Sequence, residues 1–170
     1  MTVASTSISS LVGVLYDWVT AVLPGVEVVK AYGNAPAPSG EYITIDYSGT
    51  WKRAGTTPHV VPSTDEHGVH VGPRVYTYTG SVVLRDVCGD GEKLLLLSES
   101  LDNKETTDAF AAAGFSVLRT TGPAQVPALE QSTWRHESIL TLELAWARGY
   151  AGTTPSMESV DVINESFPAS

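Results

Sequence analysis

Two prolines at alternate positions, Pro36 and Pro38, separate an apolar N-terminal segment from a run of β-branched and aromatic residues. Each proline fixes its own φ angle and keeps the residue before it out of the helical region, so this connector is extended or turned. Gly40 lets the chain change direction just before Tyr42, where the β-favouring run begins. An enzyme motif would place a nucleophile, a base or a metal ligand here, and this segment offers none. We interpret it as an architectural lead into the edge of a sheet.

The segment before the connector has the periodicity of an α-helix, which we predict over residues 5–23. Its apolar side chains recur at helical spacing and form one stripe of Ile8, Leu11, Val12, Leu15, Val19 and Val22. A hydroxyl side chain among residues 5–7 can cap the start of this helix, and Pro24-Gly25 ends it. The helix therefore has one face to bury against another element.

Alternation of apolar and polar residues predicts strands over residues 26–32, 42–48, 74–87, 115–121, 133–148 and 157–163. Gly80 lies inside one of these strands and indicates a bulge or bend. Gly122-Pro123 predicts a turn, and residues 126–129 predict a second rigid connector. The last predicted strand would lie at a sheet edge, within a C-terminal tail of about residues 155–170.

Two further helices are predicted between the strands. Asp90 and Glu92 suit the positive end of the helix dipole at the start of the first, whose buried stripe is Leu94, Leu97 and Leu101. The second covers residues 104–113 and ends at Gly114. This order of elements predicts a single α+β domain over residues 1–170, with helices packed on a mostly antiparallel sheet.

Residues 49–73 break the pattern and are predicted as a long loop or an extended hairpin arm. Trp51 stands beside two cations, Lys52 and Arg53, at the start of this segment. Because Trp and Arg are enriched at the centres of protein interfaces, we predict that these residues contact a partner. Arg74, at the far end of the segment, could join that surface. The alternative is that Trp51 folds back over the core of its own domain.

The composition favours a folded, acidic protein. Of the 170 residues, 42 % are hydrophobic and 17 % are charged, which is too apolar for a disordered chain and too lightly charged for a coiled coil. The formal net charge is −9, and no basic run appears, so a cationic DNA-binding surface is not expected. The N-terminus lacks the charged start of a signal peptide, and no apolar run approaches the ~20 residues of a membrane helix. We expect no membrane contact and a cytosolic protein at synthesis.

Histidine and cysteine patterns give little support for chemistry. His67 and His70, near His59, form an i, i+3 pair in a loop without a helix or a cysteine partner, so solvated histidines are preferred over a zinc site. The single cysteine, Cys88, cannot form an intramolecular disulfide and is predicted as a small core residue. The acids at residues 86–92 do not match a calcium loop and are explained by a helix N-terminus.

His136 could serve as a general base, but its neighbours Trp134 and Arg135 favour a strand start at a surface or interface. The chain also lacks a nucleophile elbow, a dinucleotide fingerprint and a phosphate loop. We therefore predict no catalytic, cofactor-binding or metal-ligating residue, and we predict that the protein is not an enzyme. Trp134 and Arg135 join the candidate interface residues.

Four segments together resemble the neck and tail-terminator proteins of long-tailed bacteriophages. The first is residues 34–45, in which Pro-x-Pro is followed by Tyr-Ile-Thr-Ile, and the second is the predicted strand at residues 76–86. The third is residues 126–129, followed by Trp134-Arg135 and a Leu-rich strand, and the fourth is residues 157–160. The order and spacing of these segments carry the resemblance, which spans most of the chain from the connector onward. The histidine-bearing stretch from His59 to His70 has no counterpart in the family pattern.

The resemblance implies a structural virion protein with no cofactor and no turnover. It implies a ring, usually hexameric, that caps the tail tube at full length and then docks to the head–tail connector or stopper protein. Expected partners are other copies of the chain, the tail tube protein and that connector or stopper. Genomic DNA would pass through the ring without specific binding. The protein would assemble in the host cytoplasm and reside in the tail or neck of the virion.

Three alternatives remain open from the sequence. A head-completion or stopper protein, one layer nearer the capsid, would have a similar fold and composition. A metal-dependent enzyme would use His67, His70 and His136. A monomeric binding module would use Trp51 and Arg53.

Overall fold

A computed structural model describes residues 8–31, 36–47, 51–60, 74–130 and 133–150 of the chain. It contains α1 (Ile8–Val22), β1 (Glu27–Lys30), β2 (Tyr42–Asp46), β3 (Lys52–Val60), β4 (Arg74–Val87), α2 (Glu92–Ser100), α3 (Lys104–Ala112), β5 (Phe115–Glu130) and β6 (Thr133–Tyr150). The predicted helices and most predicted strands are present within a few residues of their expected bounds. The predicted strand at residues 157–163 lies outside the described residues.

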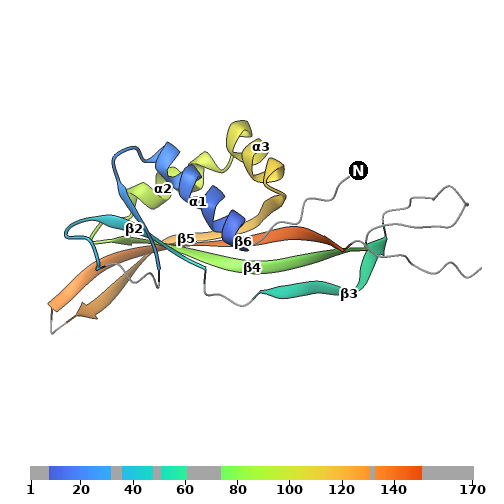
Figure 1. Ribbon diagram of the computed structural model, residues 1–170. Helices are drawn as coiled ribbons and strands as arrows, with labels where there is room; N and C mark the ends of the chain where they lie inside the picture. The colour runs from blue at the N-terminus through green and yellow to red at the C-terminus, as the bar shows by residue number, and fades with distance from the viewer. Residues whose placement is uncertain (1–7, 32–35, 48–50, 61–73, 131–132, 151–170) are drawn as a thin grey trace, which may run out of the picture.

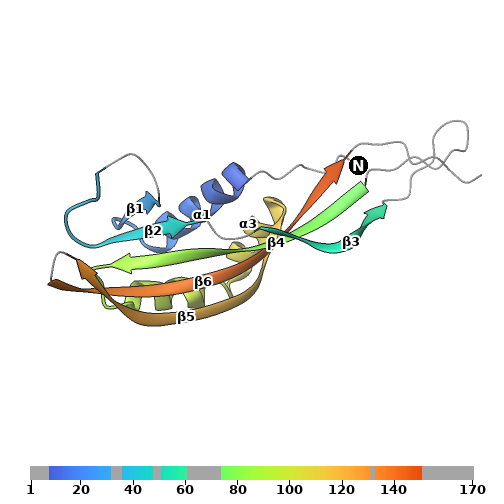
Figure 2. The ribbon, with the colours of Figure 1, turned by 90° about the horizontal axis from the view of Figure 1, so that it is seen from below.

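The six strands form one mixed, mostly antiparallel sheet, which confirms the predicted α+β class. Their order is β1-β2-β4-β6-β5, and β3 pairs with β4 on the edge that β2 leaves open. Only the β1–β2 pair is parallel among the described strands. The three helices cover one face of this sheet (Figure 1). Beyond the helices, β3 and the adjoining ends of β4 and β6 project as an extension (Figure 2).

The core lies between the helices and the covered face of the sheet. Every second side chain of a strand points toward this covered face. In β4 and β6 these inward side chains are buried and include Val82, Leu84, Leu140, Leu142 and Leu144. The predicted stripe of α1 packs against them through Leu11, Leu15 and Val19, whereas Ile8 at the start of the helix is exposed. Trp18 Nε1 donates a hydrogen bond of 3.0 Å to Ser100 Oγ and so ties α1 to α2.

The predicted segment 49–73 contains β3, so its described part is a hairpin arm paired with β4 and not a loop. Residues 52–54 pair with residues 77–79, and His59 and Val60 pair with Val75 and Arg74. We use the name arm for the described strand ends beyond the helices, which are residues 52–60, 74–79 and 145–150. Residues 61–73 lie outside the described part of the chain.

The predicted turn at Gly122-Pro123 and the predicted connector at residues 126–129 are wrong. Both lie within β5, which runs for 16 residues along β6. A register shift between Thr121 and Ala124 accommodates Gly122 and Pro123. Because β5 is the last strand in the sheet, one side of its backbone needs no partner there, and an edge strand tolerates proline for this reason.

Two smaller predictions also require correction. The proline connector leads into β2, which lies between β1 and β4 and is therefore not the edge strand. Cys88 is exposed and does not belong to the core, because β4 ends at Val87 and Cys88 turns the chain with a φ of 61°. The apolar alternation ends one residue before the cysteine.

The exposure of Cys88 gives a direct test. A maleimide reagent should modify the native chain at one thiol per molecule without denaturant, at a rate within a few-fold of that of the unfolded chain. Mass spectrometry of samples taken over time measures this. If labelling required denaturant, Cys88 would be in the core after all.

Candidate assembly surfaces

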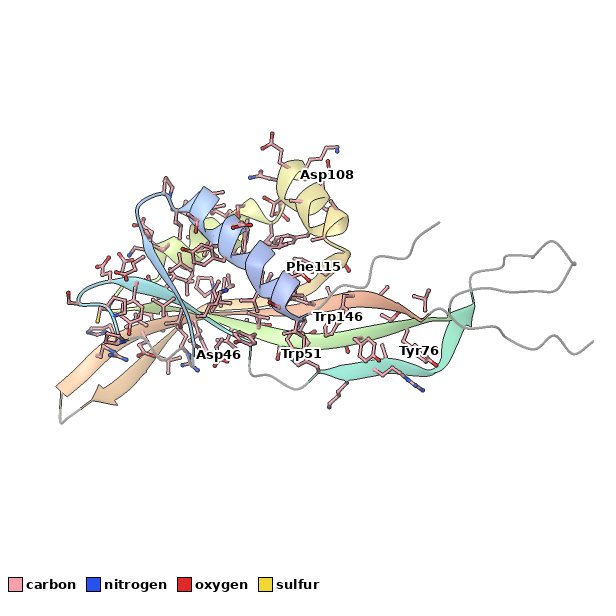
Figure 3. All side chains as sticks on the ribbon, in the orientation of Figure 1. Asp46, Trp51, Tyr76, Asp108, Phe115 and Trp146 are labelled. Atoms are coloured by element: carbon pink, nitrogen blue, oxygen red, sulfur yellow. The ribbon has the colours of Figure 1, made fainter. Side chains whose placement is uncertain are left out.

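Trp51 packs against its own sheet. Its ring lies over Gly80, where a Cβ atom would approach Trp51 Cε3 to 1.8 Å, so only glycine leaves room for the indole. Trp51 also meets Trp146 edge to face (Figure 3), at a centroid distance of 4.7 Å. Its Nε1 donates a hydrogen bond of 3.3 Å to the Tyr47 carbonyl. These contacts favour the alternative in which Trp51 extends the core of its own domain. An interface role for Trp51 remains a prediction.

The predicted bulge at Gly80 is wrong for the β4–β6 ladder. Thr79, Gly80 and Ser81 pair in sequence with Ala145, Leu144 and Glu143, without a shift. The glycine serves the close approach of the Trp51 ring and not a change of register. Gly80 and Trp51 are therefore one packing unit.

Lys52 and Arg53 are exposed on the arm. The Arg53 guanidinium lies 4.9 Å from the centroid of the Tyr76 ring, and its Nε donates to the Gly55 carbonyl at 3.1 Å. Alternation places Lys52 on the opposite face of β3 from Arg53. Arg74 pairs through its backbone with Val60 and Tyr150, at the same end of the sheet.

Trp134 and Arg135 lie at the other end of the sheet, at the start of β6. The Arg135 Nε and Nη2 atoms donate to Glu137 Oε1 at 3.1 and 2.5 Å. Arg85 Nη1 approaches the second Glu137 oxygen to 3.8 Å, so the buried carboxylate has two cations beside it. The structure thus divides the six predicted interface residues between two ends of the molecule and does not bring them together.

Sequence reasoning missed the role of Asp86, a fully buried residue of β4. Its Oδ2 accepts the Gly91 N–H at 3.1 Å, and Lys93 Nζ lies 3.7 Å from its Oδ1. Burial raises the pKa of Asp86, and the Lys93 charge and the Gly91 hydrogen bond oppose that rise. A Cβ at residue 89 would stand 2.1 Å from the carboxylate, so Gly89 allows the turn to wrap it. Because Gly91 is the N-cap residue of α2, the helix N-terminus explains this acid only in part. Gly89 and Gly91, on either side of Asp90, were a readable signal of the turn.

Lys93 links the buried carboxylate to the surface. Its Nζ lies 2.7 Å from Glu41 Oε2, and this hydrogen bond is the main reason why the pKa of Lys93 is raised. The ammonium therefore remains charged and links Glu41, the residue before β2, to the start of α2.

A groove opens beside this cluster, between the start of α2 and β5. It consists of two adjoining hollows of about 440 and 520 Å³, and both are lined by Asp90, Glu92 and Gln125. Ser138 lines the first hollow, and Glu41, Cys88, Lys93 and His136 line the second. Leu95 and Leu96 contribute exposed apolar surface to its walls, with 45 % and 51 % of each residue accessible. We call this feature the α2–β5 groove.

Within the described part of the chain, no group of three or more His, Cys, Asp or Glu residues could hold a metal ion. His67 and His70 lie outside the described residues. Likewise, no helix among the described residues has the length and apolar character needed to cross a membrane.

The sequence profile of the phage neck terminator proteins matches residues 9–168, and the chain belongs to this family. No curated protein matches the chain at a significant level. The family is structural and non-enzymatic, which excludes the metal-dependent enzyme, and its members act in tail completion in the tail or neck of the virion.

Substitution of Gly80 by Ala should destabilise the fold by about 1–3 kcal/mol, because the added methyl displaces the Trp51 ring. Thermal or urea unfolding measures the change. In a Trp51→Ala background, which should itself cost about 2–3 kcal/mol, the same Gly80→Ala change should be neutral or slightly stabilising. Equal costs in both backgrounds would show that the ring does not rest on Gly80.

Asp86 gives a prediction for pH. Because the pKa of Asp86 is raised above its usual 3.8, the folded chain binds the proton of the Asp86 carboxyl group more tightly than the unfolded chain does. Protonation of Asp86 therefore contributes fully to stability below pH 3.8, the unfolded-state pKa. This contribution is lost as the pH rises through the folded-state pKa. The free energy of unfolding of the wild type, minus that of Asp86→Asn, should fall over this window and then level off. A difference that stays constant with pH would contradict the assignment.

Proposed function

We propose that this chain assembles head to tail as a ring, hexameric as the family resemblance implies, that caps the phage tail tube when it reaches full length. The ring then forms the joint to the head–tail connector or stopper protein. Its partners are further copies of the chain, the tail tube protein and that connector, and assembly takes place in the host cytoplasm.

One observation carries the proposal: the subunit is long, and its two ends differ. The 14 residues of β4 span about 45 Å at the usual rise per residue. The arm lies at one end of this strand, and the α2–β5 groove lies at the other. A subunit with unlike exposed ends supports heterologous contacts, in which one surface meets a different surface of the next copy. Such contacts give a ring when the rotation between successive copies closes.

The charge of the chain is compatible with a DNA passage. With a formal net charge of −9, the protein would repel the phosphate backbone, so genomic DNA could slide through a ring without sticking. The further alternative of a head-completion or stopper protein shares these features. The two roles differ in which component the protein binds first.

Electron microscopy of the purified chain mixed with uncapped tail tubes tests the role. We expect ring-shaped density at the head-proximal end of the tubes and no further addition of tube protein after capping. Density that appears only on connector-bearing heads, with bare tubes left uncapped, would instead identify a stopper.

Reversal of the arm charges by Lys52→Glu together with Arg53→Glu should reduce the fraction of capped tubes by roughly tenfold at physiological salt, since close charge pairs across interfaces are worth several kcal/mol. Lys30→Glu together with Arg119→Glu reverses two exposed cations away from the arm, so it changes the net charge equally; it is the matched control and should leave capping unchanged. Circular dichroism should confirm that both variants fold. Equal capping by the arm variant and the control would remove the arm from the assembly contact.

A further inference from the structure

The α2–β5 groove contains a buried polar group without a partner. Ser138 is only 1 % exposed and lines the groove, and its Oγ has no hydrogen-bond partner among the described residues. An unsatisfied buried hydroxyl destabilises the fold, because it has given up its hydrogen bonds to water without replacing them. A ligand that brings a hydrogen-bonding group into the groove would reduce this cost.

The lining of the groove selects a cationic donor. Glu41, Asp90 and Glu92 contribute three carboxylates, against the single ammonium of Lys93. Lys93 is already held by Glu41 and Asp86. The exposed side chains of Leu95 and Leu96 offer apolar walls for an aliphatic stem. A lysine or arginine side chain has both parts: an apolar stem and a charged head that donates hydrogen bonds.

The matching cations lie on the arm of this same chain. The described arm residues contain four of the ten Lys and Arg residues and no Asp or Glu, in a protein whose net charge is −9. These four are Lys52, Arg53, Arg74 and Arg148. Because the arm and the groove lie at opposite ends of β4, one copy cannot bring its own arm to its own groove.

We propose that the cationic arm of one copy docks into the α2–β5 groove of the next copy, with Lys52 of the arm facing Asp90, Glu92 and Ser138. This inference rests on the proposed ring and identifies the contact that closes it. The groove and arm are different surfaces, so each copy uses its arm on one side and its groove on the other. A chain of such contacts forms the proposed ring when the rotation from one copy to the next closes.

The native Cys88 makes the contact measurable. It is exposed, lines the groove and is the single cysteine of the chain. In Ala54→Cys, the new thiol follows Arg53 on the exposed arm and leaves both cations in place. Mild oxidation of this variant, bound to tail tubes, should join residue 54 of one copy to Cys88 of the next and give a ladder of species larger than a dimer on a non-reducing gel.

Two control variants define the result. Ala111→Cys places a thiol on the exposed surface of α3 and should give at least tenfold less cross-linked product. Ala54→Cys combined with Cys88→Ser has one thiol per copy and should give no disulfide-linked product. A dimer that forms without Cys88 would mean that arm meets arm and would overturn the proposal, as would a product of Ala54→Cys that stops at the dimer.

Microscopy of the same samples separates the two proposals. Rings on the tubes together with no ladder, or with an equal ladder from Ala111→Cys, would overturn the arm–groove contact and leave the capping function intact. If neither rings nor cross-links form, the capping function fails and the contact fails with it.

Ser138→Ala tests the chemistry of the groove. The variant should unfold at the same or a slightly higher denaturant concentration than the wild type, because the hydroxyl has no partner among the described residues. It should nevertheless lower the cross-linking yield of Ala54→Cys several-fold. The double variant Asp90→Asn with Glu92→Gln should lower the cross-linking yield about tenfold. It keeps a side-chain oxygen at residue 90, which still accepts the backbone N–H of residue 92. Full yield in both variants would show that the groove does not receive the cation.

Discussion

The unbroken pairing of β4 with β6 is the constraint on which the rest of this structure depends. Fourteen consecutive residue pairs join the two strands, from Arg74 and Tyr150 to Val87 and Glu137. At one end, the leucines of this ladder form the floor of the helix-covered core. At the other end, the same ladder continues beyond the helices and supports β3. Because a paired strand is stiff, the ladder holds the arm at a fixed distance from the groove, and the two ends cannot act on each other within one copy.

Much of this architecture could be predicted from local patterns. The α1 stripe, the bounds of β4 and the leucine face of β6 follow from periodicity, since each of these elements buries one face. Local patterns failed where pairing with a neighbouring strand decides the structure. The prolines of β5 indicated turns, although a strand at the edge of a sheet can include proline. In the same way, Gly55 and Pro58 disfavoured a strand in the sequence, although they lie within β3.

The candidate surfaces were harder to predict because they depend on register. Trp51 stands beside two exposed cations in the sequence, but the pairing of Lys52 with Thr79 brings its ring over Gly80. Two adjacent residues thus serve different purposes, one in the core and one on the surface. Asp86 is a similar case. Spacing in the sequence groups it with Asp90 and Glu92, whereas its position on the covered face of β4 separates a buried structural carboxylate from two solvent-facing ones.

The distribution of charge gives the arm–groove contact a physical rationale beyond simple attraction. Copies of a chain with a net charge of −9 repel one another, and this repulsion opposes any ring in proportion to the number of copies it contains. Four of the ten Lys and Arg residues lie in the arm segments, which would give the proposed contact one surface that a second copy attracts. Because the groove end carries the carboxylates, attraction is strongest in the head-to-tail orientation, and two arms or two grooves repel each other. A marginal balance of this kind would favour rings on a tail end, where neighbouring copies are already held close, over rings in free solution.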